Sequence, residues 1–152
     1  MKKKIIFTIL IFFFINSCGY KPLNSSKNLD ITISNINTTG DKKINKIIKN
    51  SLKGYSNLRN KSKIINLNIN TQKNIIIISK NSKGDPLNLK MEINIEIDYL
   101  INDEIINKIK YTENFQYSNS DNKFELNNYE RTIEKNLVNK IMQSIIINLI
   151  TL

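Results

Sequence analysis

LKMEINIEIDY, residues Leu89–Tyr99, alternates apolar and polar side chains at every position. A period of two places all the apolar side chains on one face of a β-strand and all the polar ones on the other. Glu92, Glu96 and Asp98 share the polar face, so we interpret them as solvated charges and not as a catalytic cluster. The segment therefore predicts a strand with one buried face, against which other elements must pack.

Turn signals lie on both sides of this strand. Residues 81–86 read NSKGDP, and Asn102-Asp103 forms a second short cluster of turn residues. The segment Ile64–Ser79 precedes the first turn, and a third segment from Glu104 to about Tyr117 follows the second. Two turns that join three strand-like segments predict an antiparallel meander.

A further strand and a helix are predicted before the meander. Residues from Leu29 to Ile36 alternate as in a half-buried strand. From Asp41, which we expect to be the N-cap, to Lys53 the apolar side chains recur at helical spacing, and Gly54 is placed as the C′ stop. The lysines of this helix are interpreted as a solvated face, with a membrane-surface face as the alternative.

The last part of the chain changes to a helical period. Residues 114–122 are polar and predict a loop, and Asn122 followed by Glu125 resembles a capping box. From Leu126 to Leu152 apolar side chains recur every three or four residues. This segment exceeds the usual helix length of about 10–14 residues, which leaves room for a kink or a non-helical end. Residues 145–152 are apolar on almost all sides, so we expect them to be well covered.

Together these elements predict an α+β fold in the order βαβββα. We expect a single domain over residues 29–152. A strand, a helix and a parallel second strand cross over in the right-handed sense. The two helices would then pack on one face of a four-stranded mixed sheet. The other face of the sheet is polar and free to contact solvent or a partner.

The N-terminus has the layout of an export signal. Lysines at positions 2–4 precede an apolar run from Ile5 to Ile15, and small or polar residues follow. The apolar run is too short to span a bilayer, which needs roughly 20 residues. We therefore interpret residues 1–17 as a signal peptide.

Ile-Asn-Ser-Cys at residues 15–18 resembles the bacterial lipobox. The resemblance implies that Cys18 begins the mature chain and carries lipid, with palmitate among its acyl chains. Residues 18–28 would then form a lipidated tether, because Gly, Pro and Ser in this stretch oppose regular structure. The alternative is an ordinary signal peptide with an incidental Cys, but a free thiol in an exported chain is a liability.

The amino-acid composition excludes several classes of function. The chain has one Cys and no His, which excludes an internal disulfide, His-based acid–base catalysis and the usual thiolate or imidazole metal sites. We therefore expect no enzymatic activity, no catalytic residue, no metal and no cofactor.

The net charge of +10 is a feature of nucleic-acid binders, but export argues against a nucleic-acid partner. Outside the cytoplasm a basic surface suits anionic lipids, although the bias toward Ile, Asn and Lys of an AT-rich genome explains the charge equally well.

Basic residues lie beside the first predicted turn. Lys80 and Lys83 follow directly after the apolar run Ile75–Ile78. A hairpin with an apolar stem and a basic tip is suited to contact an amphiphile that carries anionic groups. A routine polar turn is the simpler interpretation, and the residues by themselves favour it.

The segment Cys18-Gly19-Tyr20-Lys21-Pro22-Leu23 resembles the start of the LPS-assembly lipoproteins of the LptE family, alphaproteobacterial forms in particular. The predicted order of elements is similar to that family as well. The resemblance implies an outer-membrane, periplasm-facing lipoprotein that plugs an LptD-like β-barrel and assists lipopolysaccharide assembly. Gly19, in place of the Asp that retains lipoproteins in the inner membrane, agrees with this location.

The family resemblance implies that basic residues near the sheet contact lipopolysaccharide, and location and charge single out Lys80, Lys83 and Lys90 for this role. The alternative function is a structural or accessory lipoprotein of another envelope transport complex, without affinity for lipopolysaccharide.

Overall fold

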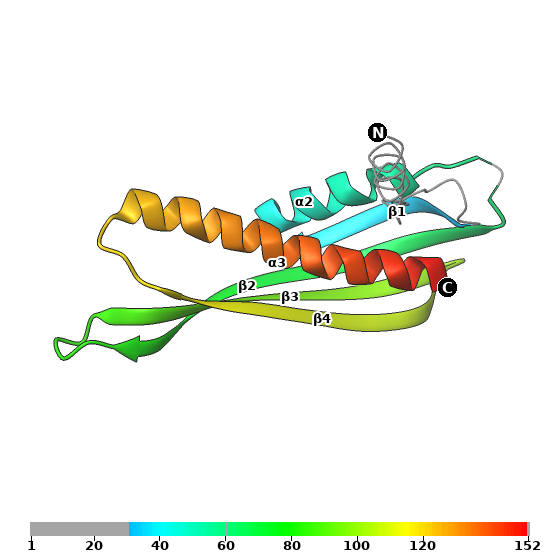
Figure 1. The fold of residues 1–152 in the computed structure, drawn as a ribbon. Helices are drawn as coiled ribbons and strands as arrows, with labels where there is room; N and C mark the ends of the chain where they lie inside the picture. Colours follow the sequence, from blue (N-terminus) through cyan, green and yellow to red (C-terminus); the bar gives the residue numbers. More distant parts are fainter. Residues whose placement is uncertain (1–30, 60, 152) are drawn as a thin grey trace, which may run out of the picture.

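The computed structural model describes residues 31–59 and 61–151. The predicted signal peptide and tether, Cys18 included, lie outside the described residues. Within them the chain forms one four-stranded sheet, and both helices lie on the same face of it (Figure 1). The predicted α+β fold with the order βαβββα is confirmed.

The strands and helices follow one another without a second sheet in the described part of the chain. They are β1 (Ile31–Gly40), α2 (Lys42–Leu52), the short 3₁₀ helix η2 (Lys53–Tyr55), β2 (Lys63–Lys80), β3 (Pro86–Ile101), β4 (Glu104–Ser118) and α3 (Lys123–Thr151). The strand order is β1-β2-β3-β4, with β1 parallel to β2 and the other two pairs antiparallel. The three strands of the predicted meander are therefore adjacent, as expected.

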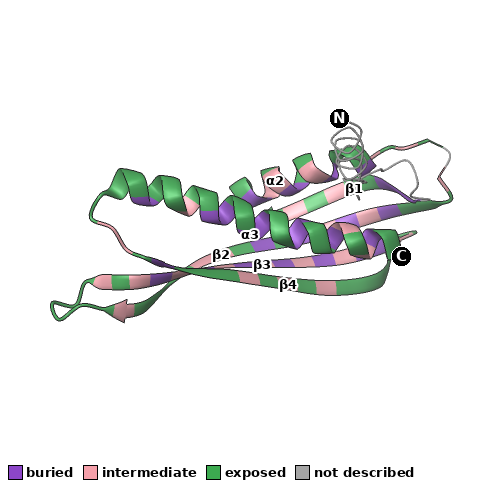
Figure 2. Ribbon diagram, in the orientation of Figure 1, coloured by how far each residue is buried: buried purple, intermediate pink, exposed green. Residues whose placement is uncertain are grey.

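The core lies between the sheet and the helices. Every second side chain of β3 from Leu89 to Tyr99 is buried, and the residues between them are half-buried on the outer face (Figure 2). The helices meet this face with their own apolar stripes, which include Ile44 and Ile48 of α2 and Ile141 of α3. The alternation of β3 thus decides which face of the sheet the helices cover.

Helix α2 begins as predicted but ends differently. The Asp41 side chain accepts hydrogen bonds from the backbone N–H groups of Lys43 and Ile44 at 2.8 and 3.1 Å, so Asp41 is the N-cap. The placement of Gly54 as the C′ stop is wrong, because α2 runs on into η2 and Gly54 lies inside that 3₁₀ helix. The left-handed backbone expected at Gly54 occurs instead at Asn57, where φ is 55°.

β1 is longer than the sequence predicted, whereas β4 ends at Ser118, next to its predicted end at about Tyr117. β1 continues to Gly40, because its polar end pairs in register with Asn68–Thr71 of β2. The predicted loop over residues 114–122 is wrong for its first half, because β4 continues to Ser118 in register with β3. Backbone pairing satisfies the N–H and C=O groups of these polar residues whatever their side chains are.

Helix α3 begins at the predicted cap. The Asn122 side chain accepts from the Glu125 backbone N–H at 3.3 Å, while the Asn122 backbone N–H donates to Ser120 instead of the Glu125 carboxylate. The capping box is therefore only half formed. The helix is continuous to Thr151, so neither break considered for this long segment occurs in the described residues.

The expectation that the C-terminal end of α3 is well covered is wrong. Ile147 and Ile150 are 59% and 46% exposed. Only one side of α3 packs on the sheet and on α2, and no other described element lies over its outer side (Figure 2).

The end of β1 makes a very close contact with β2. Gly40 has φ +90°, and a Cβ atom built on it would lie 1.8 Å from the carbonyl oxygen of Thr71. The same oxygen accepts a hydrogen bond from the backbone N–H of Asp41 at 3.2 Å. Both the backbone conformation and the available space therefore require glycine at this position.

We predict that Gly40→Ala lowers the free energy of unfolding by about 2–4 kcal/mol, because alanine is strained in a left-handed backbone and its methyl group overlaps a backbone oxygen. Gly54→Ala is the matched control, since a Cβ atom added there would have no neighbour within 4 Å and the φ of Gly54 is not positive. Urea denaturation followed by circular dichroism measures both. Equal stability of the two variants would show that the contact at Gly40 does not constrain the fold.

Candidate functional site

The hairpin that joins β2 to β3 extends beyond the N-terminal end of α3 (Figure 1). Its turn is held by Asn81, whose side-chain oxygen accepts from the backbone N–H groups of Lys83 and Asp85, both at 2.9 Å. Gly84 supplies a left-handed residue with φ +90°. The turn predicted at residues 81–86 is therefore present, and its tip faces solvent.

The three lysines predicted to contact lipopolysaccharide do not form one cluster. Lys80 and Lys83 are exposed at the hairpin tip, and neither forms an ion pair in the described part of the chain. Lys90 lies opposite Ile76 on the outer face of β3, with its ammonium 3.8 Å from the carboxylate of Glu92. Four residues of strand separate it from Lys80, about 13 Å. The tip therefore carries two lysines without an ion-pair partner in the described part of the chain, with Asp85 in the same turn, and Lys90 lies apart from them.

The stem of the hairpin is apolar on both faces. Ile75, Ile76, Ile77 and Ile78 are each 40–48% exposed. Ile75 and Ile77 lie opposite the core-face residues Met91 and Leu89, and Ile76 lies opposite Lys90 on the outer face, but the helices do not cover this end of the sheet. The structure thus places four exposed isoleucines next to two exposed lysines.

A depression of about 560 Å³ lies beside the hairpin tip. It is lined on one side by the turn and on the other by the start of α3. Lys83 and Lys123 contribute positive charge to it, and Asp85 and Asp121 contribute negative charge. Lys123 was not a predicted site residue, because it is distant in sequence and only the return of the chain from β4 brings it here.

The outer face of the sheet is polar, and its side chains are largely paired with each other. Asn37 donates to Asn68 at 3.0 Å. Lys108 and Lys110 of β4 each lie 3.4 Å from a carboxylate of β3, Asp98 and Glu96 respectively. These cross-strand pairs agree with the interpretation of the β3 carboxylates as solvated charges.

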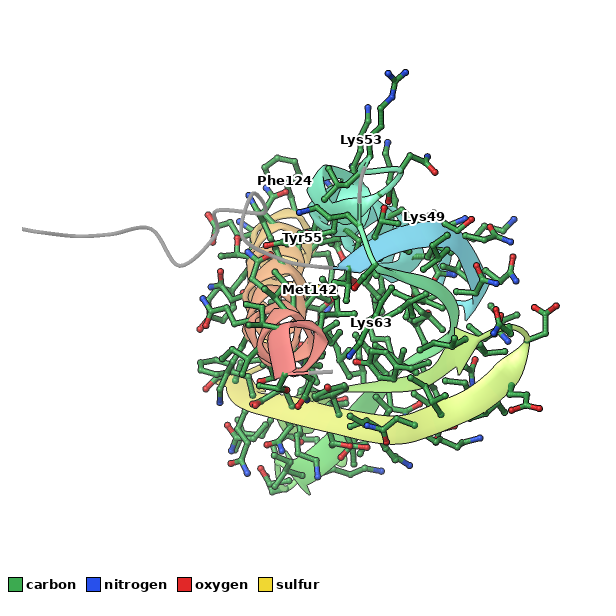
Figure 3. The ribbon with its side chains drawn as sticks, turned by 90° about the vertical axis from the view of Figure 1, so that its right-hand side faces the viewer. Lys49, Lys53, Tyr55, Lys63, Phe124 and Met142 are labelled. Carbon is green, nitrogen blue, oxygen red and sulfur yellow. The ribbon has the colours of Figure 1, made fainter. Side chains whose placement is uncertain are left out.

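A groove of about 450 Å³ separates η2 from α3. Tyr55 and Met142 lie between the two elements, as Figure 3 shows. The other lining residues are uncharged: Ser51, Gly54, Asn139, Gln143 and Ile146. The groove therefore presents no charged group to an anionic ligand.

Sequence reasoning missed an ion pair that joins three elements. Lys73 of β2 donates a hydrogen bond to the carboxylate of Glu134 on α3, and its ammonium lies 4.0 Å from Asp41. Glu134 is only 7% exposed, although glutamate is rarely buried unless it is paired. No periodicity reveals this pair, because the partners are 61 residues apart.

Two tyrosines hold β3 and β4 against α3. Burial and the contact with the Tyr111 hydroxyl, 3.5 Å away, raise the pKa of Tyr99 above its ordinary value. Burial and the 2.7 Å hydrogen bond donated to Glu130 likewise raise the pKa of Tyr117. Both hydroxyls stay protonated at neutral pH and serve as hydrogen-bonding groups at the interface between sheet and helix.

Two further properties concern the described residues alone. Among residues 31–59 and 61–151, no three His, Cys, Asp or Glu side chains are grouped so that they could hold a metal ion. In the same ranges, no helix combines the length and the apolar character needed to cross a membrane.

The arrangement of strands and helices matches solved structures of bacterial lipoproteins. Rare lipoprotein B from Shewanella oneidensis superimposes with a TM-score of 0.58 at 10% identity, over 77% of this chain and 95% of that chain. An uncharacterized lipoprotein B from Nitrosomonas europaea gives a TM-score of 0.56 at 12% identity, over 84% and 87% of the two chains. A minor lipoprotein from Acinetobacter baumannii gives 0.55 at 13% identity, over 75% and 87%.

The likeness is one of structure and not of sequence. No known protein family matches the sequence, and no curated protein matches it. At such low identity the solved structures establish the fold alone.

We predict that Lys73→Met lowers the free energy of unfolding by about 2–4 kcal/mol, because it leaves the buried carboxylate of Glu134 without its partner. The double variant Lys73→Met with Glu134→Met should recover at least half of that loss. Lys110→Met, which removes one partner of an exposed pair, should cost less than about 1 kcal/mol. Chemical denaturation of the wild type, Lys73→Met, Glu134→Met and the double variant measures the coupling, and strictly additive losses would contradict a direct interaction.

Proposed function

We propose that this chain is an outer-membrane lipoprotein, anchored through Cys18 and facing the periplasm, that plugs an LptD-like β-barrel and assists lipopolysaccharide assembly. The observation that carries the proposal is the LptE-like fold, shared with solved lipoproteins over most of the chain. The motif Cys18–Leu23 supports it separately, because it is a resemblance of sequence and not of structure.

The lipid anchor follows from the N-terminal sequence. A cut before Cys18 leaves its thiol and its amino group available for acylation. One acyl chain holds a protein only weakly at a membrane, whereas several chains hold it stably. The folded domain would then be tethered to the periplasmic surface of the outer membrane by the residues before β1.

The proposed activity is non-covalent. The chain lacks His, and the carboxylates of Glu96 and Asp98, which line a pocket of about 350 Å³ on the outer face, are each paired with a lysine of β4. The function left to such a surface is binding, with no catalytic residue, metal or cofactor involved.

Lipopolysaccharide binding is assigned to the hairpin. Its lipid part carries phosphates next to acyl chains, and the hairpin offers Lys80 and Lys83 next to Ile75–Ile78. The ammonium groups would bind the phosphates, and the isoleucines would contact the acyl chains. Lys90 would contribute less, because Glu92 already compensates its charge.

We predict that Lys80→Glu with Lys83→Glu weakens lipopolysaccharide binding by at least about tenfold, since each lysine near an anionic surface contributes about 1 kcal/mol. Lys46→Glu with Lys49→Glu is the matched control, because it makes the same change of charge at exposed positions on α2. Calorimetry measures the affinity of each double variant for purified lipopolysaccharide. An equal loss in both double variants would mean that only net charge matters.

Co-purification tests the proposed partner and the anchor together. From solubilised outer membranes, the tagged full chain should retain a large β-barrel protein. Cys18→Ala should move the protein to the soluble or unprocessed fraction, and Ser17→Ala should not, because alanine is also small enough to precede the cut. Mass spectrometry identifies the partner, and the absence of a barrel would remove this part of the proposal.

A second candidate is an accessory lipoprotein of another envelope complex without affinity for lipopolysaccharide. The distribution of exposed lysines favours this second candidate, because the lysines of α2 are as exposed as those of the hairpin and the charge is not confined to one binding surface. A retained partner other than a barrel, together with normal surface lipopolysaccharide after depletion, would support this candidate.

A further inference from the structure

β2 extends well past the strand beside it. β1 pairs with β2 only as far as Gly40, whose partner is Thr71, and the chain then turns into α2. β2 continues to Lys80 and keeps β3 as its neighbour on the other side. On the side of β1, residues 73–80 therefore have no neighbouring strand in the described part of the chain. We call this segment the open edge of β2.

The backbone groups that face the open edge can be identified from the hydrogen-bond pattern. The carbonyl oxygen of Thr71 accepts from Asp41, so the backbone groups of Thr71 point toward β1. Every second residue of a strand points the same way, so Lys73, Ile75 and Ile77 present their N–H and C=O groups to the open edge. Among the described residues, no hydrogen bond engages these groups on that side.

The side chains of the open edge do not protect it. Natural edges are usually blunted by charged residues, by proline or by a covering element. The free edge of β4 fits this rule, because it carries Lys108, Lys110 and Glu113, all in ion pairs. The open edge of β2 instead has four exposed isoleucines in a row, and no charged residue lies between Lys73 and Lys80.

We propose that the open edge of β2 binds an extended strand of a partner protein, with apolar residues in its middle and acidic residues at its ends. The partner strand would pair with the backbone of Lys73, Ile75 and Ile77 and place apolar side chains beside the isoleucines. Its acidic ends would lie near Lys73 at one end and Lys80 with Lys83 at the other. This inference does not depend on whether the chain handles lipopolysaccharide.

Two other occupants fit the open edge less well. A second copy of this chain would bring lysines against lysines in either direction, because the segment from Lys73 to Gly84 contains no acidic residue. A lipid covers the isoleucines but cannot supply the alternating donors and acceptors that a strand edge requires. Charge and backbone geometry together favour a peptide strand with acidic flanks.

The test uses the purified full chain in a non-ionic detergent and fluorescein-labelled peptides. The probe ETVTVTVTE should bind, and the lysine-flanked probe KTVTVTVTK should bind at least about tenfold more weakly. A third probe, ETVTVTVTE with its five central amides N-methylated, should not bind, because N-methylation blocks hydrogen bonding on both edges of the peptide. Fluorescence anisotropy measures all three, and equal binding of any two probes would overturn the proposal.

Protein variants locate the contact. Ile75→Pro removes an N–H that faces the open edge and leaves the pairing with β3 intact, so the acidic-flanked probe should bind about tenfold more weakly. Asn114→Pro is the matched control: the register places its N–H on the free edge of β4, and binding should not change. Circular dichroism confirms that each variant folds.

Hydrogen exchange gives an independent readout on the unaltered protein. The acidic-flanked probe should slow exchange at the amides of Lys73, Ile75 and Ile77 and leave the free edge of β4 unchanged. Protection at β4, or protection of Ile75–Ile78 by anionic phospholipid vesicles but not by the peptide, would overturn the proposal.

Discussion

Burial of one face of β3 beneath the two helices is the constraint on which the rest of the structure depends. A fully buried isoleucine contributes roughly 1.5–3 kcal/mol, whereas an exposed ion pair such as Lys110 with Glu96 contributes roughly 0–1 kcal/mol. A slip of β3 by one residue would bury Glu92, Glu96 and Asp98 in place of the apolar side chains. The register of β2 and β4, and with it the polar outer face, follows from this choice.

The functional surfaces occur where that cover ends. β2 and β3 are longer than β1 on one side and project past the N-terminal end of α3, so their projecting ends meet no helix and, on one edge, no strand in the described part of the chain. Ile75–Ile78 stay exposed for this reason, and the tip lysines form no ion pairs there. One hairpin thus offers two surfaces that share Ile75–Ile78. With the tip lysines these isoleucines suit an anionic amphiphile, and with the open edge they suit a peptide strand.

The sequence predicted the fold but misplaced several boundaries, and each error has a local cause. Asn114, Gln116 and Ser118 are polar, yet they belong to β4 because a backbone ladder needs no apolar side chains. Gly54 has the right spacing for a helix stop, but the last turn of α2 tightens into a 3₁₀ helix and the left-handed residue comes later, at Asn57. Ile147 was expected to be covered but is exposed. The expectation failed because a pattern that is apolar on all sides does not reveal how many neighbours a helix has.

By itself the sequence determined the alternation of β3, the helical periods, the two hairpin turns and the motif at Cys18, because each depends on residues close together in the chain. Tertiary structure alone decided three features. It brought Lys73 to Glu134, it set Lys90 apart from Lys80, and it ended β1 opposite Thr71. These depend on which strands and helices meet and how far each extends along its neighbour. Contacts of that kind join residues far apart in the chain, so no local pattern records them.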